Sequence, residues 1–400
     1  MISSASDRHV SRSRPTILLR SGWQTVNIGD ISHTLGVEQL LRKHLPDPQV
    51  ILWPNRMEPQ VVEMLRRHLP ALEIIDPTDA EQVNGAIDRA DLFLHGSGPS
   101  VVGRREIEQW RQRTNKPFGL LGVTVENPDA DLVALLNEAA FIFTRETDSL
   151  DHLRRAGCTC PVQAFTPDGV FAMDICDARA GDAFCAEHGL KPGEFICAVP
   201  RLRYTPYHKI YDHVDWSAEK IRLVTETNDR HGMSDHACLR ESITRWVRDT
   251  GMPALVCPEM GYQLDIIDPL VIDPLPADVK SKVVACRSFW LPDAAQAVYR
   301  SAACVVSLEC HSPIMALAVK TPAFYVRQPE DTIKGRMYYD LDLDPWVFEI
   351  DKTDPATVAD RLMQVHAAPA EVQARCEALI ARCDQLYRQA MQAVQAVLPV

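Results

Sequence analysis

The stretch VVSLECHSPIMALAVKTPAFYV, residues 305–326, holds two apolar runs separated by a polar turn and a segment of helical periodicity. Short apolar runs that alternate with helical segments indicate strands joined by crossover helices. The stretch therefore predicts one β-α-β unit of a parallel sheet. Its polar turn, which contains His311, would lie at the carboxyl end of the first strand.

The same alternation continues along most of the chain. Apolar runs at 16–23 and 49–54 precede helical segments, and the pattern restarts at 195–203 after a charged, glycine-containing stretch. Strands that alternate with helices favour an α/β protein with parallel, doubly wound sheets. A chain of 400 residues is long enough for two such domains.

We therefore expect two Rossmann-like domains facing each other across a cleft, an N-terminal one over residues 15–175 and a C-terminal one over residues 190–350. Residues 351–400 have apolar positions at helical spacing, so we expect a helical tail that can cross back to the N-terminal domain. Residues 1–14 are polar and basic without an apolar run, which predicts a disordered leader and not a secretory signal.

The composition argues against two classes of protein. The chain has 42 Lys and Arg against 54 Asp and Glu, which gives a formal charge of −12. Proteins that bind nucleic acids through phosphate contacts and counterion release are usually basic, so a nucleic-acid-binding protein is not expected. No apolar run approaches the roughly 18 residues that span a bilayer, so no integral membrane segment is expected. The 12 cysteines are scattered, which we interpret as buried thiols in a reducing cytoplasm.

Ligands of open parallel sheets bind at the carboxyl ends of strands, so the polar loops after strands are the candidates for a site. In the loop at 24–30, Gly29 permits close backbone approach and Asp30 is expected to cap the next helix. A plain capped turn is the alternative. The loop at 95–100 has two glycines whose amides we expect to face a ligand, but it lacks the full dinucleotide fingerprint, so NAD is not predicted.

Two loops in the second half of the chain carry cations or histidine. The loop at 200–209 combines three cations with two tyrosines, which indicates an anion or sugar site at least as strongly as its alternative, a solvated charge cluster. In the last loop, Ser312 followed by Pro313 is the pattern of a helix N-cap and first helical residue. His311 would then face the crevice where helix amides attract an anion and an imidazole can donate a proton. A structural histidine is the alternative.

Other polar residues have simpler interpretations. We expect Arg145 and Glu146 to form a surface ion pair at a helix start, and Asp168 to cap a turn. Glu259 and Tyr262 follow a predicted strand, where they line the site or form an ordinary turn. A helical pair is expected to flank His231 and Gly232. No histidines show the spacing of a zinc helix, so no metal site is predicted.

Several motifs, taken in order, resemble the polysaccharide pyruvyl transferase family over about residues 16–330. They are Asn27-Ile28-Gly29-Asp30, Gly96-Ser97-Gly98, Thr144-Arg145-Glu146 with Leu153 to Gly157, Pro167-Asp168, and His311 followed by Ile314-Met315-Ala316-Leu317 and Pro322. The resemblance implies a GT-B-like fold, with the acceptor on the N-terminal domain and the donor on the C-terminal domain.

The resemblance also implies a reaction. It is the transfer of the enolpyruvyl group of phosphoenolpyruvate onto two hydroxyls of a sugar or glycan, which forms a ketal. Phosphoenolpyruvate would be a co-substrate, and no cofactor is implied. His311 would be the general acid that protonates the methylene carbon. Because the donor carries a phosphate and a carboxylate, it needs cations and amide groups to hold it.

The residue chemistry and the resemblance together yield a set of candidate site residues. They are His311, Glu309 and Asp30 as catalytic; Arg201, Arg203, Lys209, Ser312, Arg327 and Lys334 as donor-binding; Asn27, Gly29, Gly96, Ser97, Gly98, Glu259 and Tyr262 as acceptor-binding.

One departure from the family pattern matters. The family usually shows Arg-x-His where this chain has Glu309-Cys310-His311, so an acid replaces an expected cation. Arg327 or Lys334 would compensate from the loop after the next strand. Alternatively, Glu309 hydrogen-bonds a ribose, and the chain is a nucleotide-sugar-dependent glycosyltransferase or epimerase of the same architecture. A non-catalytic sugar-binding relative is a third interpretation, and the acceptor and the oligomeric state stay open.

Overall fold

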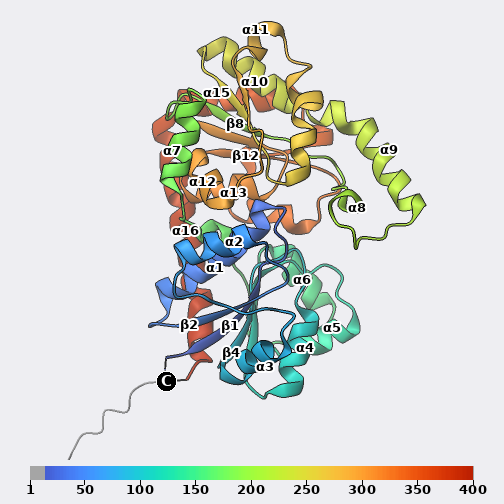
Figure 1. Cartoon of the computed structure of the whole chain (residues 1–400), viewed down its shortest axis with the longest axis vertical. Helices are drawn as coiled ribbons and strands as arrows, with labels where there is room; N and C mark the ends of the chain where they lie inside the picture. Colours follow the sequence, from blue (N-terminus) through green and yellow to red (C-terminus); the bar gives the residue numbers. More distant parts are fainter. Residues whose placement is uncertain (1–13, 400) are drawn as a thin grey trace, which may run out of the picture.

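The computed structural model describes residues 14–399, and within them the chain forms two parallel sheets, one after the other along the sequence (Figure 1). The first sheet has 7 strands in the order β3-β2-β1-β4-β5-β6-β7. They are β1 (Thr16–Ser21), β2 (Gln49–Pro54), β3 (Glu73–Ile74), β4 (Leu92–His95), β5 (Phe118–Val123), β6 (Phe141–Thr144) and β7 (Gln163–Phe165). The expected leader lies outside the described residues, except for Arg14.

The second sheet has 6 strands in the order β10-β9-β8-β11-β12-β13. They are β8 (Ile196–Val199), β9 (Ala254–Val256), β10 (Val283–Ala285), β11 (Cys304–Ser307), β12 (Ala323–Arg327) and β13 (Val347–Glu349). Every neighbouring pair in both sheets is parallel. The predicted pair of Rossmann-like, doubly wound sheets is confirmed. β13 was not among the strands expected from the sequence.

Crossover helices cover both faces of each sheet. Those of the first sheet are α1 (Ile28–His44), α2 (Pro59–His68), α3 (Ala80–Arg89), α4 (Arg104–Arg113), α5 (Ala130–Leu136) and α6 (Thr147–Arg155). Those that follow are α7 (Ala178–Glu187), α8 (Tyr207–Ile210), α9 (Ala218–Asp235), α10 (Ala237–Thr250), α11 (Ala277–Lys280), α12 (Pro292–Ser301), α13 (His311–Ala318), α14 (Met337–Asp340), α15 (Pro355–Ala367) and α16 (Pro369–Ala396).

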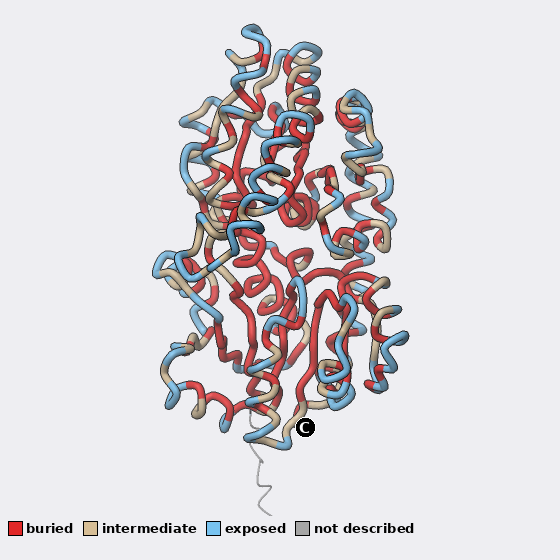
Figure 2. The backbone as a smooth tube through the Cα atoms, turned by 90° about the vertical axis from the view of Figure 1, so that its right-hand side faces the viewer, coloured by how far each residue is buried: buried red, intermediate tan, exposed pale blue. Residues whose placement is uncertain are grey.

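The strands are buried because helices cover them on both sides, which is why they read as continuous apolar runs (Figure 2). All six residues of β1 are buried, for example. One expected helix boundary is wrong: α9 runs through His231 and Gly232, and the break falls at His236. The buried ring of His236 contacts the Gly232 carbonyl through Nδ1 at 2.7 Å, which satisfies a carbonyl at the helix end.

The last helix, α16, runs from the second sheet's side of the molecule down to the first (Figure 1). It contacts α1 and β6, and its buried face includes Cys376, Leu379 and Tyr387. The Tyr387 hydroxyl donates a hydrogen bond to the Asp168 carbonyl at 2.6 Å. The helix therefore ties the two halves of the molecule together. Among residues 14–399, no helix is long and apolar enough to cross a membrane.

The strand order reverses between β1 and β4 in the first sheet, and between β8 and β11 in the second. Loops at the carboxyl ends of such strands form the ligand crevice of doubly wound sheets. The loop after β1 meets the loop after β9: the Ile28 amide donates to the Glu259 carbonyl at 3.0 Å, and the Gly261 amide to the Val26 carbonyl at 3.1 Å. The two crevices therefore open onto each other.

Candidate functional site

His311 lies where the two sheets meet, at the first residue of α13. The helix begins two positions earlier than the sequence predicted, because Cys310 and not Ser312 holds the N-cap position. Ser312 lies inside the first turn, where its amide and hydroxyl donate to Glu259 Oε2 at 2.6 and 2.7 Å. The expectation that this helix start offers free amides to an anion is therefore wrong for the Ser312 amide, since a buried carboxylate already binds it.

Two buried carboxylates flank the His311 ring. Its Nδ1 is 3.4 Å from Glu259 Oε1, and its Nε2 is 4.0 Å from Asp168 Oδ2. Burial alone would raise the pKa of Glu259, but the contacts with His311 and Ser312 outweigh it and lower the pKa. Nε2 has no hydrogen-bond partner within the described part of the chain, although only 6% of the residue is exposed. This nitrogen is the one free to act on a ligand.

Gly29, in the first turn of α1, lets the imidazole come this close. A Cβ built on Gly29 would lie 2.3 Å from His311 Cγ, far inside contact distance. The side chain of Asn27 caps α1, accepting from the Gly29 and Asp30 amides at 2.7 and 3.4 Å. The prediction that Asp30 caps the helix is wrong, and its carboxylate is instead turned toward Gln24 and His33.

Replacing Gly29 by alanine should destabilise the protein by about 1–3 kcal/mol, because the new methyl group would push His311 or α1 out of place. In an ordinary helix the same change is stabilising. Gly85→Ala in α3 is the matched control: no atom lies within 4 Å of its Cβ position, so it should leave stability unchanged or raise it. Urea unfolding of both variants checks the prediction, and equal effects would contradict it.

A second charged group comes from the first sheet. Arg145 Nη1 is 2.6 Å from Asp168 Oδ2, and both side chains are fully buried. The predicted surface pair of Arg145 with Glu146 is therefore wrong, since tertiary packing buries both residues. Burial opposes the charge of Asp168, but His33, Arg145 and His311 outweigh it and lower its pKa well below the ordinary range. Burial raises the pKa of Glu146 to about 7 despite the nearby Arg145.

Asp168 also has the expected capping role. Its Oδ1 accepts from the Val170 amide at 3.0 Å, at the start of the 3-10 turn η1 (Gly169–Ala172). Its Oδ2 faces Arg145, His33 and His311. One carboxylate thus fixes the turn with one oxygen and presents the other to the site.

The third group lies on the second sheet. Arg201 pairs with Asp331, and its Nε is 3.5 Å from Glu309 Oε2. Gln263 donates to Glu309 Oε1 at 2.7 Å. Burial raises the pKa of Glu309 to about 8, with Arg201 opposing the shift and Glu259 adding to it. Glu309 is therefore mostly uncharged at neutral pH, because burial disfavours its ionised form.

The raised pKa of Glu309 has a consequence for stability. An acid that binds its proton more tightly in the folded state stabilises the fold at low pH, and this contribution is lost as the pH rises from 4.5 to about 8. Glu309→Gln should therefore show a smaller fall in the free energy of unfolding across this range than the natural chain. Urea unfolding between pH 5 and 8.5 measures it. Glu63→Gln, at an exposed position on α2, should change nothing, and parallel curves for all three proteins would contradict the assignment.

The remaining predicted donor-binding residues lie in different places. Arg203 is held by carboxylates, with Asp235 at 2.8 Å and Asp351 at 2.6 Å. Lys209 is exposed and lines a separate cavity beside α9. Arg327 pairs with Glu349 at 3.2 Å. Lys334, in η4 (Ile333–Arg336), forms no ion pair among residues 14–399, yet its charge influences Glu309 and Asp331. Of these four, only Lys334 is a cation free to meet a ligand near Glu309.

The glycine loop after β4 is built differently from expectation. The Gly96 amide donates to the Arg20 carbonyl at 3.0 Å, and the Gly98 amide to the Gly122 carbonyl at 3.3 Å. Ser97 accepts from the Gly169 amide at 2.8 Å. The prediction that the glycine amides face a ligand is therefore wrong, because they join neighbouring strands. Tyr262, in η2 (Gly261–Asp265), accepts from the Leu202 amide at 3.1 Å and so holds the Arg201 loop in place.

A small cavity opens beside Asp30. Its volume is about 260 Å³, and it is lined by Trp23, Gln24, Asp30, Asn55, Arg56, Pro99, Tyr207, Tyr211 and His213. The residues come from loops of both halves, and the Tyr211 hydroxyl bridges them by donating to Gln24 Oε1 at 3.0 Å. Aromatic faces combined with a few polar groups are typical of sugar sites.

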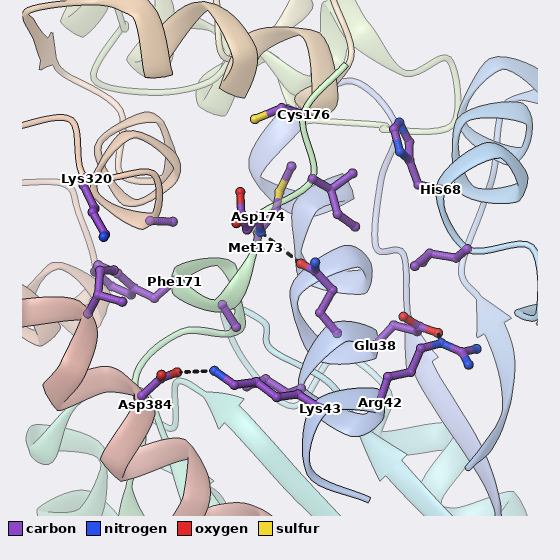
Figure 3. Close-up of a pocket in the computed structure, with 17 residues that line it drawn as sticks. Glu38, Arg42, Lys43, His68, Phe171, Met173, Asp174, Cys176, Lys320 and Asp384 are labelled. Carbon is purple, nitrogen blue, oxygen red and sulfur yellow. Dashed lines mark hydrogen bonds and ion pairs between the residues drawn. The ribbon is translucent and has the colours of Figure 1, made fainter. Parts of the chain in front are cut away.

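A larger cavity of about 780 Å³ lies elsewhere, between α1, η1 and α16 (Figure 3). Two of its charged pairs are already made, with Lys43 Nζ 2.8 Å from Asp384 Oδ1 and Arg42 paired with Glu38. It contains none of the predicted site residues. Size alone therefore does not locate the site.

One cluster has the composition of a metal site. A ring nitrogen from each of His33 and His311 and one Asp168 oxygen lie within 4.8 Å of one another. However, Asp168 Oδ2 already accepts a charge-assisted hydrogen bond from Arg145, and a cation there would face the guanidinium. The geometry suits imidazole chemistry better than metal binding, and the absence of a metal stays a prediction.

Sequence reasoning missed several members of the site. His33 carried one usable signal, because it follows Asp30 by one helical turn and so shares its face of α1. Gln263 and Asp331 carried none, since polar residues in loops are ordinarily solvated.

Comparisons with known proteins identify the family and the fold. A family model described as polysaccharide pyruvyl transferase matches residues 27–364. The chain belongs to the polysaccharide pyruvyl transferase family. The resemblance found in the sequence is thereby confirmed. No curated protein matches the chain by sequence.

Solved structures similar to this pyruvyl transferase family member show the fold. A glycosyltransferase from Rickettsia africae has a TM-score of 0.57 at 9% identity, covering 96% of this chain and 98% of its own. UDP-GlcNAc 2-epimerase from Neisseria meningitidis, bound to UDP-GlcNAc, has 0.56 at 11%, covering 95% and 100%. A UDP-forming trehalose-phosphate synthase from Burkholderia xenovorans has 0.56 at 10%, covering 96% and 99%. These are GT-B proteins, so the predicted fold class is confirmed, and family and fold together support a sugar-modifying transferase.

Proposed function

We propose that this protein transfers the enolpyruvyl group of phosphoenolpyruvate onto two hydroxyls of a sugar or glycan, forming a ketal, with His311 as the general acid. The observation that carries the proposal is the His311 ring, held between two buried carboxylates at the junction of the sheets with Nε2 unpartnered. Glu259 and Asp168 each place a carboxylate oxygen within 4.0 Å of a ring nitrogen of His311.

The cations needed for the donor are within this arrangement. Arg145 is fully buried, and its Nη2 has no hydrogen-bond partner in the described chain. Arg201 Nε likewise has none, and Lys334 forms no ion pair among the described residues. An unsatisfied buried guanidinium nitrogen is costly, and an anionic ligand relieves that cost. We assign the phosphate and carboxylate of the donor to these three side chains.

Glu309 does not oppose this assignment. Because its pKa is raised to about 8, it is mostly neutral at pH 7 and can donate a hydrogen bond to an anionic oxygen. The acid in place of the family's usual arginine then changes how the donor is held without repelling it. Weaker binding of phosphoenolpyruvate above pH 8 follows from the proposal.

The acceptor would occupy the cavity beside Asp30, where Tyr207 and Tyr211 stack at 6.2 Å and line the opening together with Trp23. Protonation of the methylene carbon by His311 leaves positive charge on the central carbon of the donor. A sugar hydroxyl attacks that carbon while Asp30 accepts its proton. Phosphate then leaves with the electron pair of its C–O bond, and a second hydroxyl closes the ketal.

The test combines the purified chain with phosphoenolpyruvate and a panel of sugars and short glycans. We expect release of inorganic phosphate together with an acceptor whose mass and NMR spectrum correspond to a pyruvate ketal. Phosphate release without a ketal would identify hydrolysis, and neither product with any acceptor would count against the proposal.

A nucleotide-sugar reaction is the second candidate, favoured by the UDP-sugars bound in solved structures with the same fold. Thermal stabilisation by uridine nucleotides but not by phosphoenolpyruvate would support it, since a ligand that binds the folded state raises Tm. Glycan binding that is unaffected by substitution of His311 would instead support a non-catalytic sugar-binding protein.

A further inference from the structure

His33 is a second imidazole in the site to which the proposed reaction has not assigned a role. It lies on α1, one turn after Asp30, and it is fully buried. Its Nδ1 is 3.9 Å from Asp30 Oδ1, and its Nε2 is 3.3 Å from Asp168 Oδ2. The rings of His33 and His311 meet edge to face, with centroids 5.0 Å apart and an interplanar angle of 78°.

The four side chains form a line of alternating acids and imidazoles: Asp30, His33, Asp168 and His311. One end, Asp30, lines the open cavity assigned to the acceptor. The other end, His311 Nε2, lies 4.0 Å beyond Asp168 Oδ2. Catalytic hydrogen bonds are often this long without substrate and shorten when it binds.

The state of His33 is unusual for a structural residue. Neither ring nitrogen makes a well-aligned hydrogen bond among the described residues, since Nε2 has only the 3.3 Å ion-pair contact with Asp168, although the ring is fully buried. Buried polar groups are normally satisfied, and each exception calls for an explanation such as catalysis. His236, at the N-cap of α10, differs in that its Nδ1 is bonded to a backbone carbonyl, although its Nε2 also lacks a partner in the described chain.

We propose that His33 carries the proton released by the acceptor hydroxyl at Asp30 across Asp168 to His311. The proposal rests on the pyruvyl transfer described above. It makes His33 a positioning and proton-carrying residue between the two ends of the reaction.

The protons balance in one turnover. The hydroxyl O–H bond breaks as its oxygen bonds the central carbon, and its proton passes to Asp30 and then to His33 Nδ1. His33 gives up its Nε2 proton across Asp168 Oδ2 to His311 Nε2, which had given its own proton to the methylene carbon. The proton of the second hydroxyl leaves with the departing phosphate as hydrogen phosphate. The number of protons on the enzyme is then unchanged. His33 carries its proton on Nδ1 at this point, and exchange with solvent returns that proton to Nε2 before the next turnover.

Four charged or titratable side chains from the surrounding elements face His33. Asp30 lies on its own helix, Asp168 precedes η1 with Arg145 bound to it, and His311 lies on α13. His95, at the end of β4, is the fourth: burial, with Arg20 and His33 contributing less, lowers its pKa to about 3. His95 is therefore neutral and does not compete for the proton.

The test compares His33→Gln with the natural chain. Glutamine keeps an amide near Asp168 but cannot pass a proton, so we expect kcat to fall about 100-fold with KM values within about twofold. At constant pH, small buffer bases should partly restore kcat of the variant, and restoration should rise with buffer pKa. The natural chain should not respond. His68→Gln, whose ring contacts Asp293 outside the site, is the control and should keep full activity.

Three results would overturn the proposal. A His33→Gln variant with kcat within a few-fold of the natural chain would show that His33 only fills space or donates a hydrogen bond. Loss of activity without any buffer response would have the same meaning. The third result is one divalent metal ion per purified chain that is absent from the His33→Gln variant. It would show that His33 is a metal ligand and not a proton carrier. If the natural chain forms no ketal at all, the pyruvyl transfer itself fails, which is a different outcome from turnover that survives His33→Gln.

Discussion

Replacing His311 by asparagine should lower kcat for ketal formation by about 10³-fold, while phosphoenolpyruvate still binds. Asparagine can keep a hydrogen bond to Glu259 from the position of Nδ1, which lies 3.4 Å from that carboxylate. It has no group at the position of Nε2 and cannot donate a proton there. The loss should therefore appear in kcat and not in the donor affinity. Steady-state phosphate release and a donor-binding isotherm measure the two quantities separately.

Two controls make this result interpretable. The variant should unfold at nearly the same urea concentration as the natural chain, because the space filled by the ring is small and Glu259 keeps its bonds to Ser312. His68→Asn, at the last residue of α2 where the ring contacts Asp293, should leave kcat unchanged. Undiminished turnover by His311→Asn would refute the role assigned to His311, whatever the acceptor proves to be.

Asp168→Asn should have the largest effect on stability, lowering the free energy of unfolding by about 3–5 kcal/mol. The carboxylate is fully buried, and its Oδ2 is 2.6 Å from the buried Arg145 guanidinium. Removing its charge leaves that guanidinium with only Glu146, 3.7 Å away and with a pKa raised to about 7, in a site of low dielectric. The loss of folding free energy comes mainly from the buried Arg145 charge that is left with too little negative charge beside it. The net contribution of the ion pair to stability is smaller. Urea or thermal unfolding measures the change.

Asp88→Asn is the matched control for this prediction. Asp88 also lies 2.6 Å from an arginine, Arg113, but both side chains are largely exposed. Water replaces the lost contact there, so little change in stability is expected. Similar losses for the two variants would contradict the argument that burial sets the cost. Asp168→Asn should also lose activity, because His33 and His311 both face the altered oxygen.

Much of the fold was predictable because its signals are local. Strands such as β1 and β11 are short apolar runs followed by helical periods, and burial on both faces leaves this pattern in the sequence. His311 was predictable for the same reason, since it directly follows such a strand and starts a helix. Features without a local pattern were missed, including β13 and the helix break at His236.

Errors at the site have a common physical cause. We predicted Arg145 and Glu146 as a surface ion pair, because adjacent charged residues are usually exposed. Both are buried, and their partners are Asp168, Thr124 and Ser149. The glycines at 96 and 98 read as a ligand loop, but their amides complete strand connections. In each case the partner lies far along the chain, and the sequence carries no mark of which distant group will satisfy a polar atom.

The amino-acid sequence by itself determined the two doubly wound sheets, the family, and the presence of a histidine at a strand-to-helix junction, because these depend on periodicity and on motifs within a few residues. Only the tertiary structure decided which charges meet. Tertiary packing buries Glu309, which raises the pKa of this carboxyl to about 8. It also places Gly29 against the His311 ring and brings Asp30, His33 and Asp168 into a row beside that ring. Desolvation and charge pairing depend on which groups are close in space. The separation of two residues along the chain does not reveal whether they are close in space.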